Sequence, residues 1–410
     1  MEPIDLEYDD AELELPSEPM SLNMGPSHPA MHGTIRMVLK LDGETVKSTD
    51  IQPGYLHRAF EKMAERGTWA QVFPYTDRLN YCSPLLNNVG YALAVEKLLG
   101  ITVPRMGQLL RVVHGELSRM ADHLTCNGAM AMELGAFTPF LWYLKAREWI
   151  WECHETQTGA RMTHSYFRIG GTALPATDQF VARARKTVQR VLEVVAEGES
   201  LLLRNRIFLD RTQGIGVLSR ETALAYGVSG PMLRGSGVDY DVRKDKPYLT
   251  YGEVDFDVPI GEDGDTFDRF MVRSEELRQS ARIIEQTLDL MEKVDPRSPD
   301  AKVSVDDPRV MLPPKSEVYG TIEGTINHFK LIMEGVDVPA GEAYAYTEGG
   351  NGELGFFVVS RGGGTPWRVR VRSPCFYSLQ SAKGLIEGGM LADIVPIFGS
   401  VNMIGGECDR

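Results

Sequence analysis

The sequence predicts an α+β fold that is mostly helical, with strands near both ends of the chain. Three observations support this class. Apolar and polar residues alternate over residues 34–41, apolar residues recur every three or four positions in three long central stretches, and short alternating segments separated by glycines follow near the C-terminus. Alternation with a period of two is typical of a half-buried strand, whereas spacing of three and four is typical of an amphipathic helix.

The composition is that of an ordinary folded protein, with 410 residues, 43% of them hydrophobic and 24% charged. The net charge is −14, and residues 1–20 contain many acidic side chains and no basic one. The rest of the chain is therefore only mildly acidic, without the basic surface that binding to nucleic acid requires. We expect no nucleic-acid partner.

The cysteine content and the hydropathy of the sequence argue against further classes of protein. The five cysteines are scattered and form no Cys-x-x-Cys motif, which argues against a disulfide framework and against a metal cluster held by this chain. The longest uncharged run, residues 79–95, contains several polar residues and is too short for a membrane span. No signal peptide is visible at the start of the sequence.

The N-terminal part divides into two predicted regions. Residues 1–20 predict a mobile acidic tail because they combine high charge with three prolines and little apolar content. Residues 21–100 predict a region of strands and loops. Within it, a strand over residues 34–41, a turn at Asp42-Gly43 and a second strand near residues 44–51 predict a β-hairpin.

Residues 101–300 predict a helical bundle with a loop-rich insert at 211–265. Three apolar stripes with helical spacing support the bundle. The stripes consist of Leu109, Val113, Leu117, Met120 and Leu124, then Val181, Ala184, Val188, Leu192 and Val195, and finally Phe270, Leu277, Ala281, Ile284, Leu288 and Met291.

Residues 310–410 predict a C-terminal α/β region. Alternating segments at 342–347, 354–360 and 368–372 are separated by glycine-rich turns, and this pattern is typical of a β-meander. A short helix is predicted near residues 381–391. Residues 21–410 are expected to work as one functional unit.

The first candidate site is the glycine- and proline-rich loop at residues 25–33, which carries His28 and His32. The histidines are four residues apart, but Pro29 and Gly33 make a helix unfavourable, so the helical spacing of metalloprotease ligands does not apply. A histidine held in such a loop either has a functional role or caps a turn. The residues alone leave both interpretations open.

Two further candidate sites are a region rich in tyrosine and arginine and an isolated carboxylate. Residues 55–62 and 74–81 are rich in tyrosine and arginine, including Arg58, Arg78 and Tyr81. The arginines either lie near a buried anion or metal cluster, whose reduced state they would favour, or pair with acidic neighbours. Glu133 is the only ionisable residue within 130–139, and a lone carboxylate in apolar surroundings is costly unless it is paired or protonated.

These segments, taken together, resemble the 49-kDa-type subunit family of proton-pumping NADH:quinone oxidoreductase, respiratory complex I. The resemblance runs from about residue 21 to residue 410, and several independent motifs occur in the family's order. The matching stretches are residues 25–33, 54–62, 74–81, 158–162, 230–234, 243–244 with 247–248, 328–331 and 406–410.

The family is related to the large subunits of [NiFe] hydrogenases, which implies the same mostly helical fold with its N-terminal β-hairpin, central bundle and C-terminal meander. In hydrogenases, paired cysteines near both ends of the chain hold the metal. This chain has no such pair near residues 58–81, and its C-terminal stretch has only Cys408. One thiolate cannot replace four ligands, so the resemblance implies that the former metal cavity takes a quinone head group. No metal is expected.

The resemblance places the two head-group contacts on His32 and Tyr81, with the acid at Glu133 contacting the histidine. Reduction of a quinone to a quinol requires two protons, and both residue types can donate at a carbonyl oxygen. The reference pKa of tyrosine is about 10, so the phenol is protonated at pH 7. The family commonly has Asp at the position of Glu133, so the longer side chain changes the geometry of this contact.

The same resemblance places Arg58, Arg78 and residues 163–164 near an iron–sulfur cluster that the neighbouring subunit binds. Many members carry a histidine directly after the Ala-Arg-Met run, whereas this chain has Thr163 there and His164 one place later. A neutral hydroxyl takes up no proton when a cluster is reduced, so we expect the cluster potential to depend little on pH. Some relatives carry a methylated arginine at the position of Arg58.

The sequence thus predicts a peripheral-arm subunit that forms a quinone site and supplies protons, with ubiquinone or menaquinone as substrate. The expected partners are the iron–sulfur subunit, the 30-kDa-type subunit and the membrane subunit at the entrance of the quinone tunnel. The expected location is the cytoplasmic face of the bacterial plasma membrane. Two alternatives are a nickel-bearing hydrogenase-type enzyme and a structural subunit that has lost its site.

Overall fold

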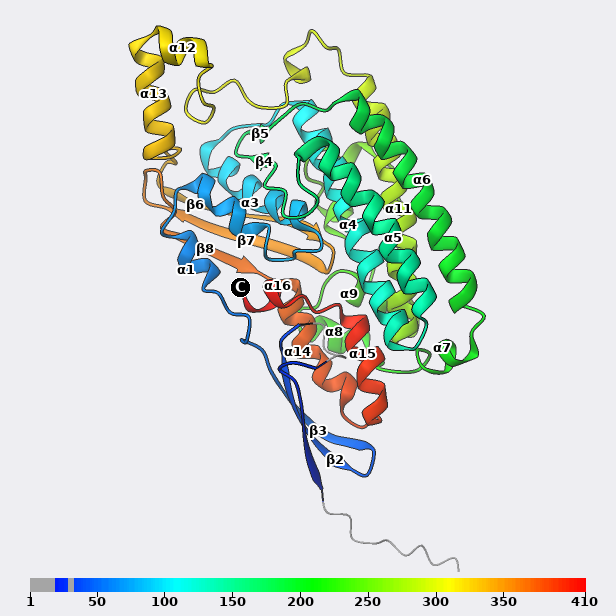
Figure 1. Ribbon diagram of the computed structural model, residues 1–410. Coiled ribbons are helices and arrows are strands. Elements are labelled where there is room, and N and C mark those ends of the chain that lie inside the picture. Colours follow the sequence, from blue (N-terminus) through cyan, green and yellow to red (C-terminus); the bar gives the residue numbers. More distant parts are fainter. Residues whose placement is uncertain (1–18, 29–32) are drawn as a thin grey trace, which may run out of the picture.

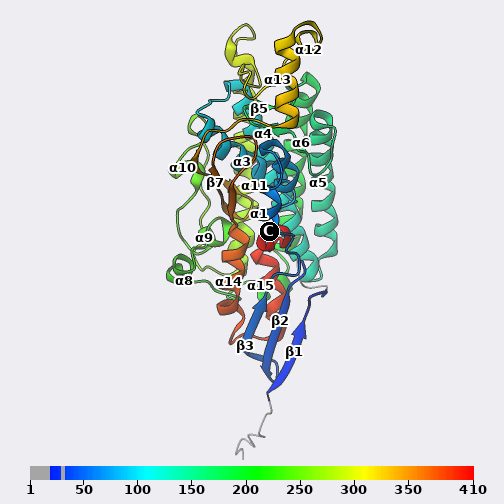
Figure 2. The ribbon, with the colours of Figure 1, turned by 90° about the vertical axis from the view of Figure 1, so that its left-hand side faces the viewer.

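The computed structural model describes residues 19–28 and 33–410. Its architecture is mostly helical α+β, with a small N-terminal sheet that projects from one end, a bundle of long helices, and a C-terminal sheet beside the bundle (Figure 1). The molecule is narrower when it is turned by 90° (Figure 2). The predicted fold class is confirmed at this level. The division into regions within residues 21–410 stays a prediction.

The N-terminal sheet has three antiparallel strands in the order β1-β2-β3, where the sequence predicted a two-stranded hairpin. Strands β2 (Arg36–Asp42) and β3 (Thr45–Gln52) form that hairpin, with Gly43 in the left-handed region at the turn. Strand β1 (Met20–Met24) pairs with β2. Its pairing partner β2 begins twelve positions after the end of β1 in the numbering, so local alternation alone does not reveal β1. Most of the predicted tail, residues 1–18, lies outside the described residues.

The bundle consists of four long helices that lie side by side (Figure 1). They are α4 (Arg105–Glu133), α5 (Phe137–Thr158), α6 (Asp178–Leu202) and α11 (Thr266–Glu292). Most residues of the three predicted apolar stripes are buried in one shared core. Helix α4 packs against both α5 and α11, so it runs through the centre of the molecule.

The predicted loop insert at 211–265 contains several short helices. They are α8 (Arg220–Ala225), α9 (Pro231–Gly235), α10 (Val242–Asp245) and the 3₁₀ turn η2 (Tyr251–Glu253), and α7 (Arg206–Asp210) directly precedes the insert. Each helix has six residues or fewer, so none shows a helical repeat in the sequence. The residues of α9 are buried, which brings Arg234 into the interior.

The C-terminal meander is confirmed. Strands β6 (Gly341–Gly349), β7 (Gly352–Ser360) and β8 (Arg368–Arg372) are antiparallel and pair in sequence order. Helix α3 (Pro84–Leu99) packs against β6 and β7, so segments from both ends of the chain share one apolar core.

Three helices follow the meander: α14 (Pro374–Ile386), α15 (Ile394–Val401) and α16 (Gly405–Asp409). The predicted helix at 381–391 was wrong in its bounds. Helix α14 begins earlier, because Pro374 occupies its first turn, and Gly388 with a positive φ follows its end. These helices pack beside the N-terminal sheet and close the lower half of the molecule (Figure 1).

The remaining elements are short, apart from a helical hairpin, α12 (Lys315–Gly320) and α13 (Ile322–Met333), that stands at the edge of the molecule (Figure 1). The others are α1 (Phe60–Ala64), η1 (Trp69–Val72), α2 (Phe73–Thr76), β4 (Phe167–Arg168), β5 (Gly171–Thr172), η3 (Pro299–Ala301) and η4 (Leu391–Asp393). In the part of the chain that the structure describes, no helix is both long enough and apolar enough to cross a membrane.

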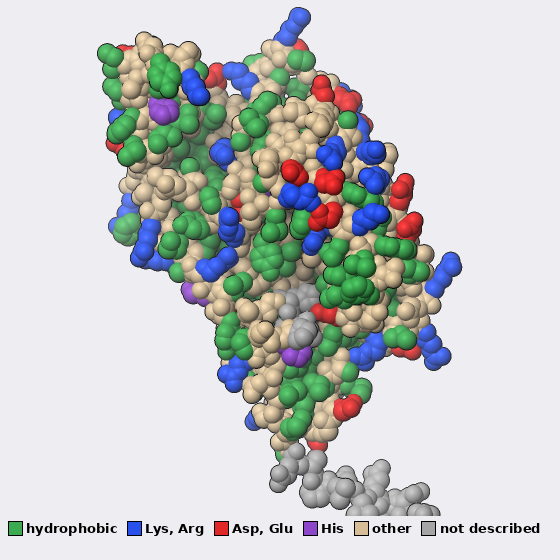
Figure 3. All heavy atoms as spheres, viewed as in Figure 1, with side chains coloured by type: hydrophobic (Ala, Val, Ile, Leu, Met, Phe, Trp, Pro, Cys, Tyr) green, Lys and Arg blue, Asp and Glu red, His purple; other side chains and the backbone are tan. Residues whose placement is uncertain are grey.

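The α12–α13 hairpin exposes apolar side chains, which gather around a histidine at the upper left of Figure 3. Tyr319 is 87% exposed and Ile322 is 75% exposed, and Ile326, Phe329 and Met333 continue the same face of α13. Exposed apolar patches of this kind mark interaction surfaces. The hairpin therefore has the character of a contact region for another polypeptide.

Candidate functional site

Tyr81 lies in the short connection between α2 and α3. The Asn80 side chain accepts hydrogen bonds from the backbone N–H groups of Cys82 (3.1 Å) and Ser83 (3.3 Å), which closes an Asx turn around Tyr81. Pro84 then starts α3. The Tyr81 ring is half-buried against the apolar cluster formed by the N-terminal sheet and the C-terminal helices. A fixed turn thus presents one phenol at the junction of the two ends of the chain.

The carboxylate that accompanies this turn is Asp122, from the middle of α4. Its Oδ2 accepts a hydrogen bond from Asn80 (2.9 Å), and its Oδ1 accepts one from Asn402 (3.1 Å). A Cβ at Gly350 would lie 1.8 Å from Oδ2, so only glycine fits the backbone at this point. Asp122 therefore ties α4 to the Tyr81 turn, to the β6–β7 turn and to the segment after α15.

A second buried carboxyl, Glu407 of α16, continues the same cluster. The Cys375 thiol donates to Oε2 of Glu407 at 3.4 Å and accepts a hydrogen bond from Asn351 at 3.1 Å. Asn402 donates to Oδ1 of Asn351 at 2.6 Å and so completes the connection to Asp122. We name this set the Tyr81 cluster. It consists of Asn80, Tyr81, Asp122, Asn351, Cys375, Asn402 and Glu407.

The pKa values in the cluster are set mainly by burial. Burial raises the pKa of Tyr81 to about 12, and Cys82, Cys375 and Asp122 act in the same direction, while Arg58 opposes them. Burial also raises the pKa of Glu407 to about 7, although hydrogen bonds from Cys375 lower it. At pH 7 the phenol is protonated, and the Glu407 carboxyl is close to the midpoint of its titration.

Arg58 and Arg78 lie next to this cluster and next to each other. Nη2 of Arg58 donates to the carbonyl oxygens of Arg78 (2.6 Å) and Gly406 (3.4 Å), and Nη1 of Arg78 donates to the carbonyl oxygen of Pro74 (2.6 Å). Both side chains are exposed and donate hydrogen bonds to backbone carbonyl oxygens. The structure therefore places the two arginines beside each other, and their position near an iron–sulfur cluster of a neighbouring subunit stays a prediction.

The loop that carries Thr163 and His164 is attached to the same region through Asp77. The Asp77 carboxylate accepts hydrogen bonds from the backbone N–H of Ser165 (2.8 Å) and from its hydroxyl. Burial raises the pKa of Asp77 to about 6, although the bonds from Ser165 lower it. Thr163 has a φ of 54° and is half-buried, with its hydroxyl turned onto the Met162 carbonyl. Thr163 and Arg78 thus lie on loops that are bonded together.

His164 points into the protein and belongs to a row of three buried histidines. Its ring centroid lies 4.5 Å from that of His154, and Nδ1 of His154 lies 3.1 Å from Nδ1 of His114. Burial lowers the pKa of His164 to about 4, despite a contact with the Arg161 carbonyl. It lowers the pKa of His114 to about 3. At neutral pH His164 and His114 are therefore uncharged.

Glu133 lies at the end of α4, against α15. A Cβ at Gly399 would lie 2.5 Å from its Oε2. The helical rise of 1.5 Å per residue places Glu133 roughly 16 Å along α4 from Asp122, so the acid beside Tyr81 is Asp122. His32 lies outside the described residues, and its predicted contacts with quinone and with Glu133 stay predictions.

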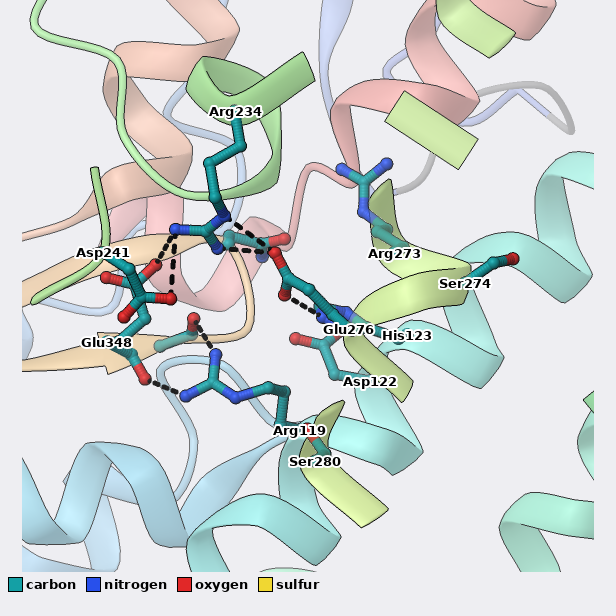
Figure 4. A network of polar contacts seen from close by, with 12 residues as sticks. Arg119, Asp122, His123, Arg234, Asp241, Arg273, Ser274, Glu276, Ser280 and Glu348 are labelled. Carbon is teal, nitrogen blue, oxygen red and sulfur yellow. Dashed lines mark hydrogen bonds and ion pairs between the residues drawn. The ribbon is translucent and has the colours of Figure 1, made fainter. Parts of the chain in front are cut away.

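Near Asp122, α4 carries a second polar assembly, which we name the arginine network (Figure 4). Arg234 from α9 lies between Glu276 of α11 (2.7 Å) and Glu348 of β6 (2.9 Å), and Glu276 also contacts Nε2 of His123 (2.7 Å). The network consists of Glu116, Arg119, His123, Arg234, Asp241, Arg243, Glu276 and Glu348. All of these side chains are buried.

In this network the pKa values of Glu116 and Glu276 are lowered, unlike those of the Tyr81 cluster. Burial alone would raise the pKa of Glu116, but Arg119 and Arg243 outweigh it and hold the pKa at about 2. Arg234 and His123 likewise keep the pKa of Glu276 well below its usual range despite burial. Burial and Asp241 raise the pKa of Glu348 against the effect of Arg234. Paired charges therefore outweigh burial at Glu116 and Glu276 but not at Glu348, and the contacts of the network join α4, α9, α11 and β6.

Several of these groups were not singled out from the sequence. Glu116, Arg119 and Asp122 recur at steps of three on α4, and such a polar stripe on a central helix is a signal that can be detected. Cys375 and Glu407 gave no comparable signal, because they meet only through tertiary contacts.

Among the described residues, no three His, Cys, Asp or Glu side chains form a group that could hold a metal ion. A pocket of about 800 Å³ between α6 and α11 is lined by residues such as Val181, Leu288 and Met291, and by none of the predicted site residues. The chemistry of the described chain is therefore concentrated in the Tyr81 cluster and its arginines, which offer proton donors and hydrogen bonds.

Comparison with known proteins gives consistent matches. A family model described as "Respiratory-chain NADH dehydrogenase, 49 Kd subunit" matches residues 133–410. A D-type subunit of the NADH-quinone oxidoreductase of Sorangium cellulosum is 62% identical over 410 residues, the full length of both chains. The D-type subunit of Myxococcus xanthus is 50% identical over 97% of this chain and 94% of its own. A D-type subunit of Anaeromyxobacter sp. strain Fw109-5 is 52% identical over 97% of this chain and 90% of its own.

Proposed function

Because this chain belongs to the family of the 49-kDa subunit of respiratory-chain NADH dehydrogenase, and is thus a subunit of an NADH-quinone oxidoreductase complex, we propose that it forms the quinone head-group site of that complex. In this proposal Tyr81 donates a hydrogen bond and a proton to one quinone carbonyl, and His32 does so at the other. The electrons come from an iron–sulfur cluster of the neighbouring subunit.

The observation that carries this proposal is the setting of Tyr81. Its phenol is held by the Asn80 turn, is half-buried, and has a pKa raised to about 12 by burial. A phenol in this state is a hydrogen-bond donor at every physiological pH. Asp122 and Glu407 belong to the same cluster, and their hydrogen-bond partners are amides, two hydroxyls and a thiol. This arrangement suits protonation of a reduced, anionic oxygen.

Arg58, Arg78 and Thr163 support the second half of the proposal. They lie on bonded loops at one end of the Tyr81 turn, and exposed guanidinium groups favour the electron-rich state of a neighbouring cluster. We place the partner's iron–sulfur cluster against this surface. Glu133, about three helical turns from Asp122 on α4, then lies on the side where the quinone enters.

The proposal extends to partners and location. The proposed neighbours are the iron–sulfur subunit, the 30-kDa-type subunit and the membrane subunit at the quinone tunnel. The exposed apolar face of α13 supports contact with another subunit. The complex would lie at the cytoplasmic face of the bacterial plasma membrane, with ubiquinone or menaquinone as substrate. We also propose that the chain shares the fold of hydrogenase large subunits and that its quinone site occupies the former metal cavity of that fold.

The test is the Tyr81→Phe variant in the assembled complex. Removal of a general acid lowers the rate by about a hundredfold or more, so we expect NADH:quinone reductase activity to be lost. NADH oxidation with an artificial acceptor that takes electrons before the quinone site should persist. Tyr75→Phe, six residues earlier in the same motif, serves as the matched control and should keep quinone reduction. Undiminished quinone turnover in Tyr81→Phe would overturn the proposal.

A further inference from the structure

The C-terminal sheet has a basic edge strand, β8, whose arginines lie on its outer face. Val369 and Val371 of β8 are buried in the apolar core that the sheet shares with α3. Because side chains alternate along a strand, Arg368, Arg370 and Arg372 lie on the opposite face, and the first two are exposed. The order β6-β7-β8 leaves β8 at the edge of the sheet. Three arginines therefore follow one another along this edge.

Aromatic side chains continue this outer face across the sheet. Phe357 of β7 is the register partner of Arg370, and Tyr344 of β6 is the register partner of Phe357. Phe357 is half-buried, and Tyr344 is 36% exposed. Two aromatic rings and one guanidinium group thus form a row across all three strands. Aromatic and arginine side chains are the residue types that are enriched where proteins bind each other.

Two adjoining hollows share Arg370 and Arg410 in their linings. The first, of about 370 Å³, is lined mainly by aromatic side chains and arginines, and the second, of about 350 Å³, is lined mainly by charged side chains. We name the two hollows and their linings the β8 groove. Its acidic side chains are Glu61 and Asp409, and its lysine and arginine side chains are Lys62, Arg368, Arg370, Arg372 and Arg410. The chain as a whole has a net charge of −14, so this basic groove contrasts with the rest of the protein.

Both carboxylates of the β8 groove already have partners within the chain. Glu61 accepts a hydrogen bond from the backbone N–H of Val371 at 3.1 Å and lies 3.5 Å from Arg368. Asp409 accepts hydrogen bonds from two backbone N–H groups of the segment before α1, at 2.9 and 2.8 Å. The acids of the groove therefore fix its shape, and the surplus of charge in the groove is positive.

Arg370 differs from the other basic residues of the groove. Arg368 pairs with Glu65 at 3.2 Å, and the guanidinium carbon of Arg372 lies 4.8 Å from the centre of the Tyr377 ring. Within the described ranges of the chain, Arg370 has neither a hydrogen bond nor an ion pair. A guanidinium group can donate two parallel hydrogen bonds to one carboxylate. Arg370 thus presents this capacity between neighbours that are already held in place.

The free edge of β8 is closed to an additional strand at Val371. Its N–H donates to Glu61, and its carbonyl oxygen accepts a hydrogen bond from Nη1 of Arg410 at 3.0 Å. Side chains that cover the backbone groups of an edge strand prevent it from pairing with another strand. A partner must therefore be recognised through side chains in the hollows, without extension of the sheet.

We propose that the β8 groove binds an acidic segment of another subunit of the complex, with a carboxylate on Arg370 and an apolar side chain against Tyr344 and Phe357. The chain is a subunit of a multisubunit complex, so a neighbouring polypeptide is available as the occupant. Separate hollows of this size fit individual side chains, whereas a lipid surface is flat. The inference does not rest on the role of Tyr81, so either proposal can fail without the other.

The first experiment identifies the occupant. The photo-crosslinking amino acid p-benzoylphenylalanine replaces Tyr344 in the purified, assembled complex, and the cross-linked peptide is sequenced by mass spectrometry after irradiation. We expect a peptide of another subunit that is rich in Asp and Glu. A neutral or basic peptide, a lipid, or a peptide from the acidic residues 1–20 of this chain would overturn the proposal, and so would the absence of a cross-link.

The second experiment tests the charge of Arg370. Like charges that face each other across an interface oppose binding strongly, so Arg370→Glu should lower the yield of complete complex, purified through a tag on this chain, by at least about tenfold. Arg370→Lys keeps the charge and should retain most of the yield. Arg204→Glu changes another exposed arginine, just after α6, and is the matched control. Equal yields in Arg370→Glu and Arg204→Glu would contradict the proposal. If Arg370→Glu does not fold, the cross-link decides.

Discussion

Helix α4 carries two buried polar assemblies that solve the same physical problem in opposite ways. In the arginine network, carboxylates such as Glu116 and Glu276 are charged because guanidinium groups surround them. In the Tyr81 cluster, Glu407 has neutral partners and a pKa raised to about 7. The comparison teaches that the surrounding arginines keep Glu116 and Glu276 charged, whereas the neutral partners of Glu407 leave burial to raise its pKa.

The largest expected effect comes from breaking the arginine network. Arg234→Met leaves Glu276 and Glu348 buried without their guanidinium, and removal of one partner from a buried pair costs about 3–5 kcal/mol. Unfolding of the purified chain in urea measures this loss in the free energy of unfolding.

Arg185 provides a matched control. It contacts Asp289 at 2.7 Å and Glu292 at 2.9 Å, the same two distances that Arg234 has to Glu276 and Glu348, but at the surface. Arg185→Met should cost at most about 1 kcal/mol. Equal losses in the two variants would show that burial does not distinguish the network.

The second effect is a pH dependence with opposite signs in the two assemblies. The pKa of Glu116 is lowered to about 2, so its contribution to stability is present above pH 4.5 and is lost as pH falls towards 2. The pKa of Glu407 is raised from 4.5 to about 7, so its contribution is present below pH 4.5 and is lost as pH rises through 7.

Glu407→Gln should therefore reduce the loss of stability between pH 5 and pH 8 by about 3 kcal/mol, because one pKa unit corresponds to about 1.4 kcal/mol. Urea unfolding at the two pH values measures the difference. Glu342→Gln, on the exposed side of β6, is the control and should leave the pH dependence unchanged. An identical dependence in Glu407→Gln and wild type would place Glu407 with the paired carboxylates.

The smallest expected effect concerns the loop beside Arg78. Thr163 does not titrate. The pKa values of His164, about 4, and of Asp77, about 6, both lie below pH 7. Between pH 7 and 9, the potential of the proposed iron–sulfur cluster of the neighbouring subunit should shift far less than the roughly 59 mV per pH unit of a fully proton-coupled one-electron step.

Thr163→His sharpens this expectation. Histidine tolerates the positive φ at this position better than most residues, and it adds a titrating group where many family members have one. A potentiometric titration should then show a larger slope in the variant than in the wild type. A steep slope already in the wild type would assign proton uptake to His164.

The sequence predicted the parts of the fold that repeat locally. The stripe on α4 and the meander of β6 to β8 were found because their period is visible over many residues. Strand β1 and the short helices of the 211–265 insert were not, because β1 depends on a distant partner and helices such as α9 are too short to show a period. In the site, the motif around Tyr81 was visible, but its partners Asp122 and Glu407 were not.

The sequence by itself determined the family and the helical core and singled out Tyr81 as the candidate phenol, since these depend on residue types and spacings along the chain. Only the tertiary structure decided which acid accompanies Tyr81. It places Asp122 and Glu407, 285 positions apart in the numbering, in one hydrogen-bonded cluster, and it leaves Glu133 at the far end of α4. The physical reason is that the charge of a buried carboxyl depends on its neighbours in space, which no local pattern records.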